Sequence, residues 1–215
     1  EKLLQPLDQD NLTCMDELLE DVKYQPYDPD NGYSVPYFWG TVGIVYDKTK
    51  VSEAELEEQG YAIFLNEKFK GDIYVYDSER DSFMMALKSL GYSMNTESEE
   101  ELQKAYEWLV QCVTTMEPEI VTDEIIDNMA QGRKALGLCY SGDATYIMSE
   151  NENMGFYMPS EGTNRWYDAM VIPANAENPQ LAHEFINFVC EYDVAYGNSA
   201  YVGYTSPNQA VMEDL

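Results

Sequence analysis

Histidine is almost absent from this sequence, and its scarcity excludes several kinds of site. His183 is the only histidine among 215 residues. The pair His183-Glu184 therefore lacks the second histidine of a HExxH zinc motif, and we expect His183 to lie on the surface of a helix. The sequence also contains no GxSxG, P-loop or GxGxxG motif, so it offers no catalytic nucleophile and no phosphate-binding loop. Acids are abundant, and a carboxylate pair for glycoside hydrolysis stays open as an alternative.

Cysteine is also scarce and widely spaced. The four cysteines, Cys14, Cys112, Cys139 and Cys190, form neither a CxxC pair nor a zinc-knuckle spacing. Cys139 lies in an apolar strand pattern, and Cys112 and Cys190 lie on apolar helix faces, so we expect buried free thiols. We therefore predict no metal site and no cofactor.

Positive charge is limited. The chain has 12 Lys and Arg against 40 Asp and Glu, which gives a net charge of −28 at pH 7. This balance argues against a nucleic-acid groove and against affinity for anionic lipid. It favours a cationic ligand or a high-salt setting, and solubility alone is the other explanation. The 18 tyrosines supply flat rings with polar tips, which suit pockets and wet surfaces alike.

Long apolar runs are missing as well. No run of about 18 apolar residues occurs, so we expect no membrane insertion by this segment. No signal peptide is present, and the chain begins with glutamate instead of methionine. We expect that upstream sequence has been removed or omitted.

Strand patterns alternate with helix patterns along most of the chain, which predicts an α/β fold with mostly parallel or mixed sheets. The apolar run at residues 35–46 predicts a buried strand pair or one long strand crossing between lobes, with Gly40 and Gly43 allowing bends. Further apolar runs predict strands at residues 72–76, 135–140 and 169–173. Helical spacing predicts helices at residues 51–60, 78–91, 98–116, 125–132 and 179–191. Two helices are expected to start with capping boxes, Ser78 with Asp81 and Ser98 with Glu101.

Two of these helices have apolar faces that we expect to be buried. In the helix over 98–116 the face consists of Leu102, Tyr106, Leu109, Cys112, Val113 and Met116. In the helix over 179–191 it consists of Leu181, Phe185, Phe188 and Val189.

Trp166 and Asp168 form the most informative pair. They stand two residues apart before the strand 169–173, so their side chains project to the same side of an extended segment. A carboxylate accepts N–H bonds from an ammonium group, and an aromatic ring packs against its methylenes or faces its charge. The pair therefore suits an organic cation, although a core tryptophan beside a solvated aspartate is the alternative.

Other acids and aromatic residues stand at the carboxyl ends of predicted strands or in loops, where α/β folds place ligands. Asp81 follows the strand 72–76, and Tyr140 and Asp143 follow the strand 135–140; Tyr204 lies in a glycine-flanked loop. Together they predict a negative, aromatic-walled site for a cation. Alternatively, Asp81 is only the helix partner of Ser78, and Asp143 is only a turn residue.

Four stretches along the chain resemble the spermidine/putrescine-binding components of polyamine ABC transporters. They are YSVPYFWG at 33–40, MALKSLGYS at 85–93, WYDAMVIPANA at 166–176 and GYTSPN at 203–208. The resemblance implies a two-lobed fold of the type II periplasmic-binding-protein kind, with mixed sheets flanked by helices. It assigns residues 1–40 and 168–215 to an incomplete lobe 1 and residues 41–167 to lobe 2, with hinge crossings near 39–41 and 167–168.

The same resemblance implies roles for the candidate residues. Asp168 binds an amine, Trp166 packs along the polyamine chain, and Tyr204 lines the pocket. Asp81 falls where the family has a glutamate that binds the other end of the ligand. These roles describe a receptor that needs no reacting group, so we predict that the chain is not an enzyme.

Three positions bear on the choice of ligand. Ser78 stands where spermidine-preferring relatives have a second acid, and Tyr140 stands where they have a tryptophan. Asp143 matches an aspartate of putrescine-preferring relatives. The resemblance therefore leaves the choice between putrescine and spermidine open.

The resemblance further implies that the family's N-terminal quarter precedes Glu1 and that a final helical segment follows Leu215. We expect the 215 residues alone to bind polyamine weakly, and exposed sheet edges to promote dimerisation of the fragment.

The leading hypothesis is an extracytoplasmic, periplasmic or cell-surface protein that closes its two lobes on putrescine or spermidine and delivers it to an ABC permease. It would be membrane-anchored or fused to the permease upstream. The alternatives are an enzyme acting on a cationic or sugar substrate and a ligand-sensing domain of the same fold.

Overall fold

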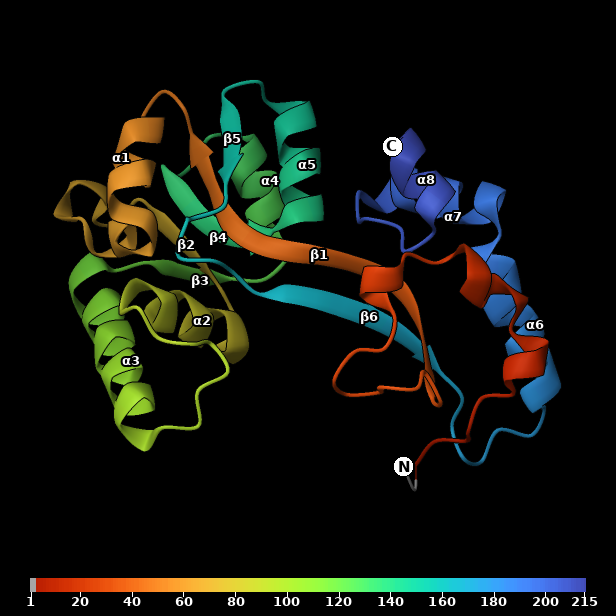
Figure 1. Ribbon diagram of the computed structural model, residues 1–215. Helices are drawn as coiled ribbons and strands as arrows, with labels where there is room; N and C mark the ends of the chain where they lie inside the picture. The colour runs from red at the N-terminus through yellow and green to blue at the C-terminus, as the bar shows by residue number, and fades with distance from the viewer. Residues whose placement is uncertain (1–2) are drawn as a thin grey trace. The chain divides into compact units, whose positions relative to one another are not determined.

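The computed structural model describes residues 3–215; the first two residues of the segment assigned to lobe 1 lie outside this range. The chain divides into unit 1, Glu1–Gly40 with Trp166–Leu215, and unit 2, Thr41–Arg165 (Figure 1). The sequence predicts the second crossing after residue 167, whereas the structure divides the chain after Arg165. Among the described residues, none of the helices is long and apolar enough to cross a membrane.

A mixed sheet forms the frame of unit 2. In the described residues its strand order is β3-β2-β4-β1-β5, and β6 pairs with β1 outside this order. β2 runs parallel to β3 and β4, whereas β1 runs antiparallel to β4 and β5. The strands are β1 (Ser34–Asp47), β2 (Ile73–Tyr76), β3 (Glu119–Val121), β4 (Leu136–Tyr140), β5 (Met154–Tyr157) and β6 (Arg165–Val171).

β1 is one long strand, which is one of the two arrangements that the apolar run at residues 35–46 allows. From Val42 to Asp47 every residue is buried. Gly43 permits close packing, because a Cβ atom there would come within 2.5 Å of the Phe156 ring. The strand can therefore pass directly beneath the Phe156 ring of β5.

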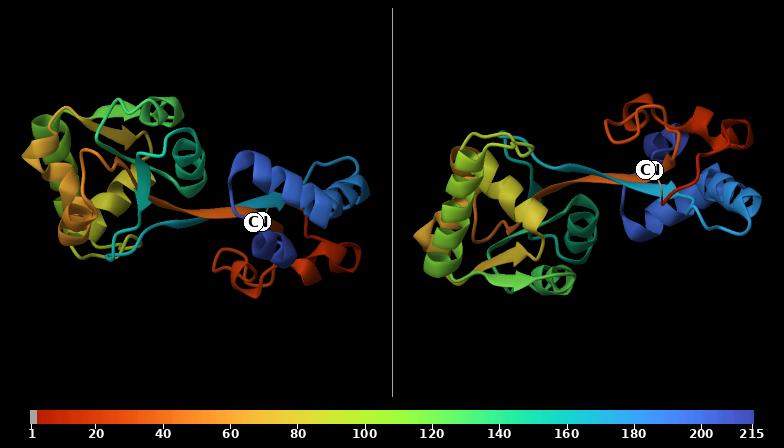
Figure 2. Two further views of the ribbon diagram at one scale, coloured as in Figure 1. Left: turned by 90° about the horizontal axis from the view of Figure 1, so that it is seen from above. Right: turned by 90° about the horizontal axis from the view of Figure 1, so that it is seen from below.

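Helices cover both faces of this sheet (Figure 2). α4 (Glu124–Ala130) and α5 (Ser141–Glu150) share a core with Val45, Tyr74 and Cys139. Tyr74 and Val75 point to opposite faces of β2, and Val75 lies against α2 (Glu79–Ser89) and α3 (Glu99–Gln111). α1 (Glu53–Gln59) begins at Ser52 with a capping box and ends at Gly60.

The two expected capping boxes form only in part. Ser78 and Ser98 cap their helices by accepting the backbone N–H of Asp81 and Glu101. Neither acid returns a bond to the backbone N–H of its cap residue: the Glu101 carboxylate accepts the hydroxyl of Thr96 at 2.5 Å, and the Asp81 carboxylate accepts the hydroxyl of Ser78 at 2.9 Å.

The expected apolar face of α3 is partly wrong. Tyr106 and Val113 are 55% and 50% exposed, whereas Ala105 and Trp108 are buried. α3 passes into a π-helical turn, Cys112–Met116, in which Cys112 and Met116 are buried. A π turn adds a residue to the helical repeat, so a face drawn at regular 3.6-residue spacing does not continue through it.

Unit 1 combines three short 3₁₀ turns with α6 (Pro179–Cys190), α7 (Tyr192–Val202) and α8 (Gln209–Asp214). The turns are Gln9–Asn11, Thr13–Glu17 and Glu20–Val22. Isolated bridges join Leu4 to Pro173, Leu18 to Asn208 and Trp39 to Thr205. The core contains Leu7, Leu12, Cys14, Leu18, Val35, Ile172, Ile186, Val189 and Cys190.

The face that α6 buries is not the expected one. Leu181, Phe185 and Phe188 are 57%, 59% and 51% exposed, and only Val189 of the predicted set is buried. Apolar residues line two sides of this helix, so periodicity alone does not identify the side that packs.

His183 belongs to the buried side of α6, contrary to the expectation of a surface histidine. It is 6% exposed. Its Nε2 accepts the backbone N–H of Asp8 at 2.9 Å, and its Nδ1 lies 2.6 Å from the carbonyl oxygen of Pro179. Because Asp8 donates to Nε2, Nδ1 carries the proton and donates to Pro179. The histidine therefore ties the N-terminal segment to α6.

Candidate functional site

Asp81 is the centre of a hydrogen-bonded group in unit 2. It lies in the first turn of α2, directly after β2, and is 2% exposed. Its Oδ2 accepts the hydroxyls of Ser78 at 2.9 Å and Tyr140 at 3.0 Å, and its Oδ1 accepts the side-chain amide of Asn164 at 2.9 Å. All three donors are neutral. This buried carboxylate thus has three neutral hydrogen-bond donors and no ion pair in the part of the chain that the structure describes.

The group is held together by the topology of the sheet. β2 and β4 are parallel neighbours. Tyr76 and Tyr140 are the last residues of these two strands, so they lie together at the carboxyl ends of the strands. Their rings lie edge to face with centroids 5.0 Å apart. The Tyr76 hydroxyl donates to Asp123 Oδ1 at 2.9 Å. Burial, followed by this bond to Asp123, raises the pKa of Tyr76 well above its usual value.

Asp143 lies close to this group but is not shown to bond to Asp81. It occupies the first turn of α5 and is half-buried. Helix N-termini stabilise a carboxylate at this position. Its negative charge is one of the smaller causes that raise the pKa of Tyr76 and of Cys139, after burial. The structure therefore brings Ser78, Asp81 and Tyr140 into one bonded group, with Asp143 as a nearby charge.

In unit 1, Trp166 and Tyr204 form an aromatic pair. Their rings lie edge to face with centroids 4.9 Å apart, and Phe38 lies 6.0 Å from Tyr204. Trp39 donates its backbone N–H to the carbonyl of Thr205 at 3.2 Å. This bridge holds the loop that carries Tyr204 against β1. Trp166 is held separately, because it lies in strand β6.

Asp168 follows Trp166 at the two-residue spacing of β6. Its carboxylate has no hydrogen bond or ion pair with any residue in the described part of the chain. Much of the surface of Asp168 is accessible to solvent. The surrounding protein nevertheless partly desolvates its carboxyl group, and this raises the pKa of Asp168. Because water still reaches it, we treat this as a modest destabilisation of the charged form. A cation that replaced the lost solvation would favour that form.

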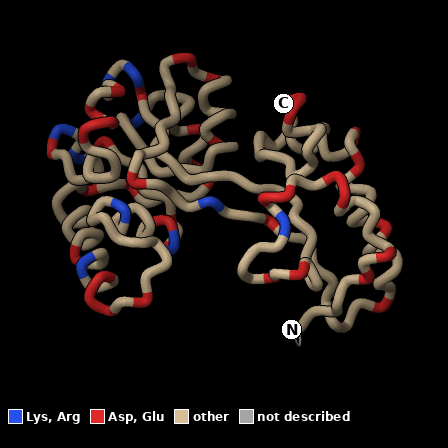
Figure 3. Tube along the Cα trace, viewed as in Figure 1, with Lys and Arg blue, Asp and Glu red and all other residues tan. Residues whose placement is uncertain are grey.

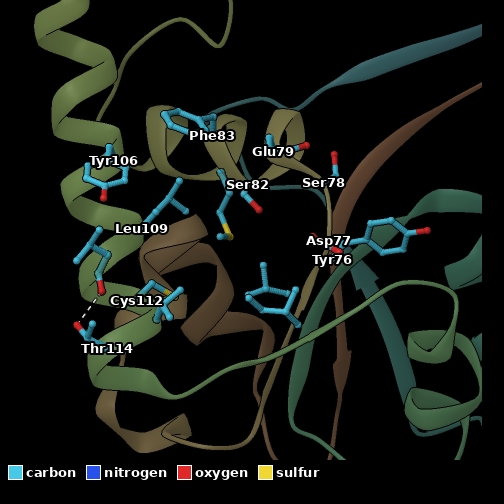
Figure 4. A pocket seen from close by; sticks show the side chains of 15 residues that line it. Tyr76, Asp77, Ser78, Glu79, Ser82, Phe83, Tyr106, Leu109, Cys112 and Thr114 are labelled. Carbon is cyan, nitrogen blue, oxygen red and sulfur yellow. Dashed lines mark hydrogen bonds between the residues drawn. The ribbon is translucent and has the colours of Figure 1, made fainter.

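An apolar groove on unit 2 adjoins the Asp81 group, since Tyr76 and Ser78 are among the residues that line it (Figure 4). Its volume is about 380 Å³, and it lies between β2, α2 and α3. Phe83, Tyr106, Leu109 and Val113 contribute apolar side chains, and Ser78 lies at its edge. Most of the lining is apolar and suits hydrocarbon, and the carboxylates of Asp77 and Glu79 also line the groove.

Two members of the unit 2 group are absent from the sequence prediction, Tyr76 and Asn164. Tyr76 could have been found, because it ends a strand as Tyr140 does. Asn164 carries no comparable signal: it lies in a loop before β6, and only the folded chain brings it to Asp81. Among the described residues, no group of three or more His, Cys, Asp or Glu side chains could hold a metal ion.

Comparisons with known proteins give consistent findings. A family model described as "Bacterial extracellular solute-binding protein" matches residues 1–214. The chain is 32% identical over 215 residues to the spermidine/putrescine-binding periplasmic protein of Escherichia coli, and this match covers 100% of the chain. It is 30% identical over 227 residues to a putrescine/agmatine-binding protein of Pseudomonas aeruginosa, with 98% of the chain covered.

Solved structures agree in fold. A substrate-binding protein of a spermidine/putrescine ABC transporter from Streptococcus pneumoniae superposes with a TM-score of 0.85 at 36% identity over 99% of the chain. A putative spermidine/putrescine ABC transporter from Listeria monocytogenes gives 0.87 at 35% identity, also over 99%. They confirm the predicted α/β fold with mixed sheets flanked by helices.

The chain is shorter than the proteins it matches. It spans 61% of the length of both curated relatives and 65% of both solved chains.

Proposed function

Since the chain belongs to the family of bacterial extracellular solute-binding proteins, we propose that it forms part of the polyamine-binding component of an ABC importer. The family consists of binding proteins and not of enzymes. Two of its relatives are named for spermidine and putrescine or for putrescine and agmatine. All of these ligands carry amino or guanidino groups on a short hydrocarbon chain, which agrees with the net charge of −28.

The uncompensated carboxylate of Asp168 beside the Trp166–Tyr204 pair is the observation that carries this proposal. An ammonium group would supply the missing partner, and it would offset the partial desolvation that raises the pKa of Asp168. The rings of Trp166 and Tyr204 lie close together and would pack against the methylenes of the ligand. Asp168 is therefore the proposed amine anchor of unit 1.

Unit 2 supplies the second group of the proposal. The rings of Tyr76 and Tyr140 would form its aromatic wall. Asp143, which is half-buried, would supply the carboxylate that contacts the ligand. Asp81 is buried and already accepts three hydrogen bonds. Its proposed contribution is to fix the hydroxyl of Tyr140 and to add negative potential at these strand ends. We further propose that the unit 1 and unit 2 groups bind the same ligand molecule, and that the protein delivers this ligand to an ABC permease.

The residues also bear on ligand choice. Ser78 is neutral and acts as a helix cap, so it adds no second acid next to Asp81. Asp143 provides a carboxylate at the neighbouring strand end. We therefore propose that putrescine binds better than spermidine or as well as it does.

Calorimetric titration of the chain with putrescine, spermidine, butylamine, glycine and glutamine tests this function. Butylamine keeps the hydrocarbon chain of putrescine but has one amine. The second amine should add one charge-assisted bond. The affinity for either polyamine should therefore be at least about tenfold higher than the affinity for butylamine. Equal affinity for butylamine and putrescine, or tighter binding of either amino acid, would refute the proposal.

A further inference from the structure

Two of the four cysteines lie together in the core of unit 1. Cys14 belongs to the 3₁₀ turn Thr13–Glu17, and Cys190 is the last residue of α6. They are 5% and 3% exposed and belong to the same hydrophobic cluster. Cys112 and Cys139 lie in unit 2, where burial raises the pKa of each thiol.

The backbone around the pair is held in place from two sides. Asn187 Oδ1 accepts the backbone N–H of Cys14 at 3.2 Å, and its Nδ2 donates to the carbonyl of Asn11 at 2.7 Å. Asn187 and Cys190 are three residues apart on α6 and so share one face of the helix. Asn208 Nδ2 donates to the carbonyl of Cys190 at 3.2 Å. These bonds place Cys14 over the face of α6 that carries Cys190.

The two thiols also interact in the folded core. The interaction with Cys190 lowers the pKa of Cys14, and the interaction with Cys14, followed by burial, raises the pKa of Cys190. In the closed core Cys14 is therefore the thiol that ionises first, and the thiolate is the reactive form in disulfide exchange.

We propose that Cys14 and Cys190 form a disulfide bond that joins the two separate segments of unit 1. The proposal rests on the extracellular family of the chain, because disulfides form and persist in oxidising compartments. It does not depend on the ligand. A chain that fails to bind polyamine can still carry this bond.

The oxidant is a protein or small-molecule disulfide. The Cys14 thiolate attacks one sulfur of the oxidant, forms a mixed disulfide and releases the other sulfur as a thiolate. The Cys190 thiolate then attacks Cys14 in the mixed disulfide and releases the second thiol. Two electrons pass to the oxidant, and the protons lost by Cys14 and Cys190 go to the two released thiolates. Because both residues are buried in the folded chain, exchange takes place before the core of unit 1 has closed. In that state ordinary ionisation of the exposed thiol supplies the thiolate, and the lowered pKa of Cys14 belongs to the closed core.

The expected consequence is a more stable unit 1. Residues 3–40 and 166–215 are connected only through unit 2, so their separation in the unfolded chain is large. A disulfide that closes such a long loop restricts the unfolded state most. Oxidation should raise the unfolding temperature of unit 1 by roughly 4–20 °C.

The test is to refold the reduced 215-residue chain with oxidised and reduced glutathione and count reactive thiols after denaturation. Two of the four thiols should become unreactive, and the chain should lose the mass of two hydrogen atoms. Non-reducing peptide mapping should find the Cys14 peptide linked to the Cys190 peptide. Cys112→Ser and Cys139→Ser should keep this link, whereas Cys14→Ser and Cys190→Ser should abolish both the link and the thermal shift.

Four reactive thiols after oxidative refolding would overturn the proposal, and so would a bond that joins Cys112 or Cys139 or links two chains. The peptide map of the unsubstituted chain decides the matter even where a serine variant fails to fold.

Discussion

Unit 2 encloses its sheet with helices from its own stretch and leaves an apolar groove beside α3 open, whereas unit 1 is assembled from two stretches and leaves a face of α6 open in the described residues. Unit 2 is one uninterrupted stretch, Thr41–Arg165, and helices pack on both faces of its sheet. Unit 1 is built from two stretches joined by a shared apolar core, by isolated bridges and by side-chain bonds of His183, Asn187 and Asn208. Its α6 exposes Leu181, Phe185 and Phe188. The comparison shows that each unit has an apolar core of its own, and that polar side-chain bonds in unit 1 join segments that are far apart in the sequence.

The distribution of acidic residues does not distinguish the two units, because Asp and Glu occur along the chain in both (Figure 3). The difference lies in how individual carboxylates are held. Asp28 in unit 1 is 8% exposed, whereas Glu55 in unit 2 pairs with Lys68 at a surface where the two side chains are 27% and 49% exposed.

The largest effects on stability should come from shortening one buried side chain in the core of each unit, which tests whether the two units unfold independently. Ile125 and Ile172 are 0% and 1% exposed and belong to the cores of unit 2 and unit 1. Ile125→Ala and Ile172→Ala should each lower the free energy of unfolding by about 2–5 kcal/mol. Hydrogen exchange read by mass spectrometry should show the loss of protection in the truncated unit.

Ile120→Ala is the matched control, because Ile120 is 53% exposed, and it should change protection little. Equal loss of protection in both units from either core variant would show that the units unfold as one body, and the comparison would then fail.

A smaller effect is expected from Asp28, which organises a turn of unit 1. Its carboxylate accepts the backbone N–H groups of Gly32 and Tyr33, each at 3.0 Å, and the hydroxyl of Ser34 at 2.6 Å. Asp28→Ala should cost about 1–3 kcal/mol, because it leaves these donors without their acceptor. Exposed Asp30 provides the control, and Asp30→Ala should have little effect on thermal unfolding.

Asp28 also predicts the acid sensitivity of unit 1. Burial alone would raise its pKa, but the bonds from Ser34, Tyr33 and Gly32 outweigh burial and lower it. A lowered pKa in the folded state contributes stability above the ordinary aspartate value, and this stability is lost as pH falls through the folded value. Below pH about 4, protection in unit 1 should therefore fall in the native chain but not further in Asp28→Ala. A parallel fall in both would contradict this assignment.

Ligand preference should change moderately with Asp143. Asp143→Asn removes one carboxylate near Tyr76 and Tyr140 without changing its size. Putrescine affinity should fall about tenfold, which corresponds to one lost charge-assisted bond. Spermidine and putrescine are to be titrated side by side. An unchanged putrescine affinity would remove Asp143 from the proposed site.

The smallest effect is expected from the surface ion pair of Glu55 in unit 2. The hydrogen bond from Lys68, with those from Ser52, lowers the pKa of Glu55 to about 2. Lys68→Gln should destabilise unit 2 by about 0.2–1 kcal/mol at neutral pH, since exposed pairs contribute little. Because the pKa is lowered, the difference should persist above pH about 4.3 and vanish as pH falls towards about 2.

Lys70→Gln breaks the more exposed pair of Lys70 with Glu117 and should change stability less than Lys68→Gln. A larger loss from Lys70→Gln would reverse this ranking of the two pairs.

Local patterns in the sequence predicted several elements of unit 2 but not β3, α5 or β5. The apolar run at residues 35–46 became β1, and Ser78 and Ser98 became helix caps, because strand pattern and caps depend on neighbouring residues. The rule that α/β folds place ligands at strand ends led to Tyr140, which the structure bonds to Asp81. The same rule, applied to the strand 72–76, would have led to Tyr76.

The errors arise where distant residues decide the outcome. His183 was expected on the surface because its own helix does not reveal that Asp8 donates to it. The buried side of α6 depends in the same way on which segments of unit 1 pack against it. Asn164 joins Asp81 only after the chain has folded. Such contacts have no periodicity, and one sequence contains no signal for them.

The central claim is that a carboxylate beside an aromatic pair binds an amine, and titration of putrescine into Asp168→Asn tests it most directly. Asparagine keeps the size of the side chain and removes its charge. Loss of one charge-assisted bond should weaken binding about tenfold to a hundredfold, whereas Asp30→Asn, an exposed substitution of the same kind in unit 1, should bind as the unsubstituted chain does. If Asp168→Asn and Asp30→Asn bind putrescine equally well, Asp168 is not the amine anchor and the account of the site is wrong.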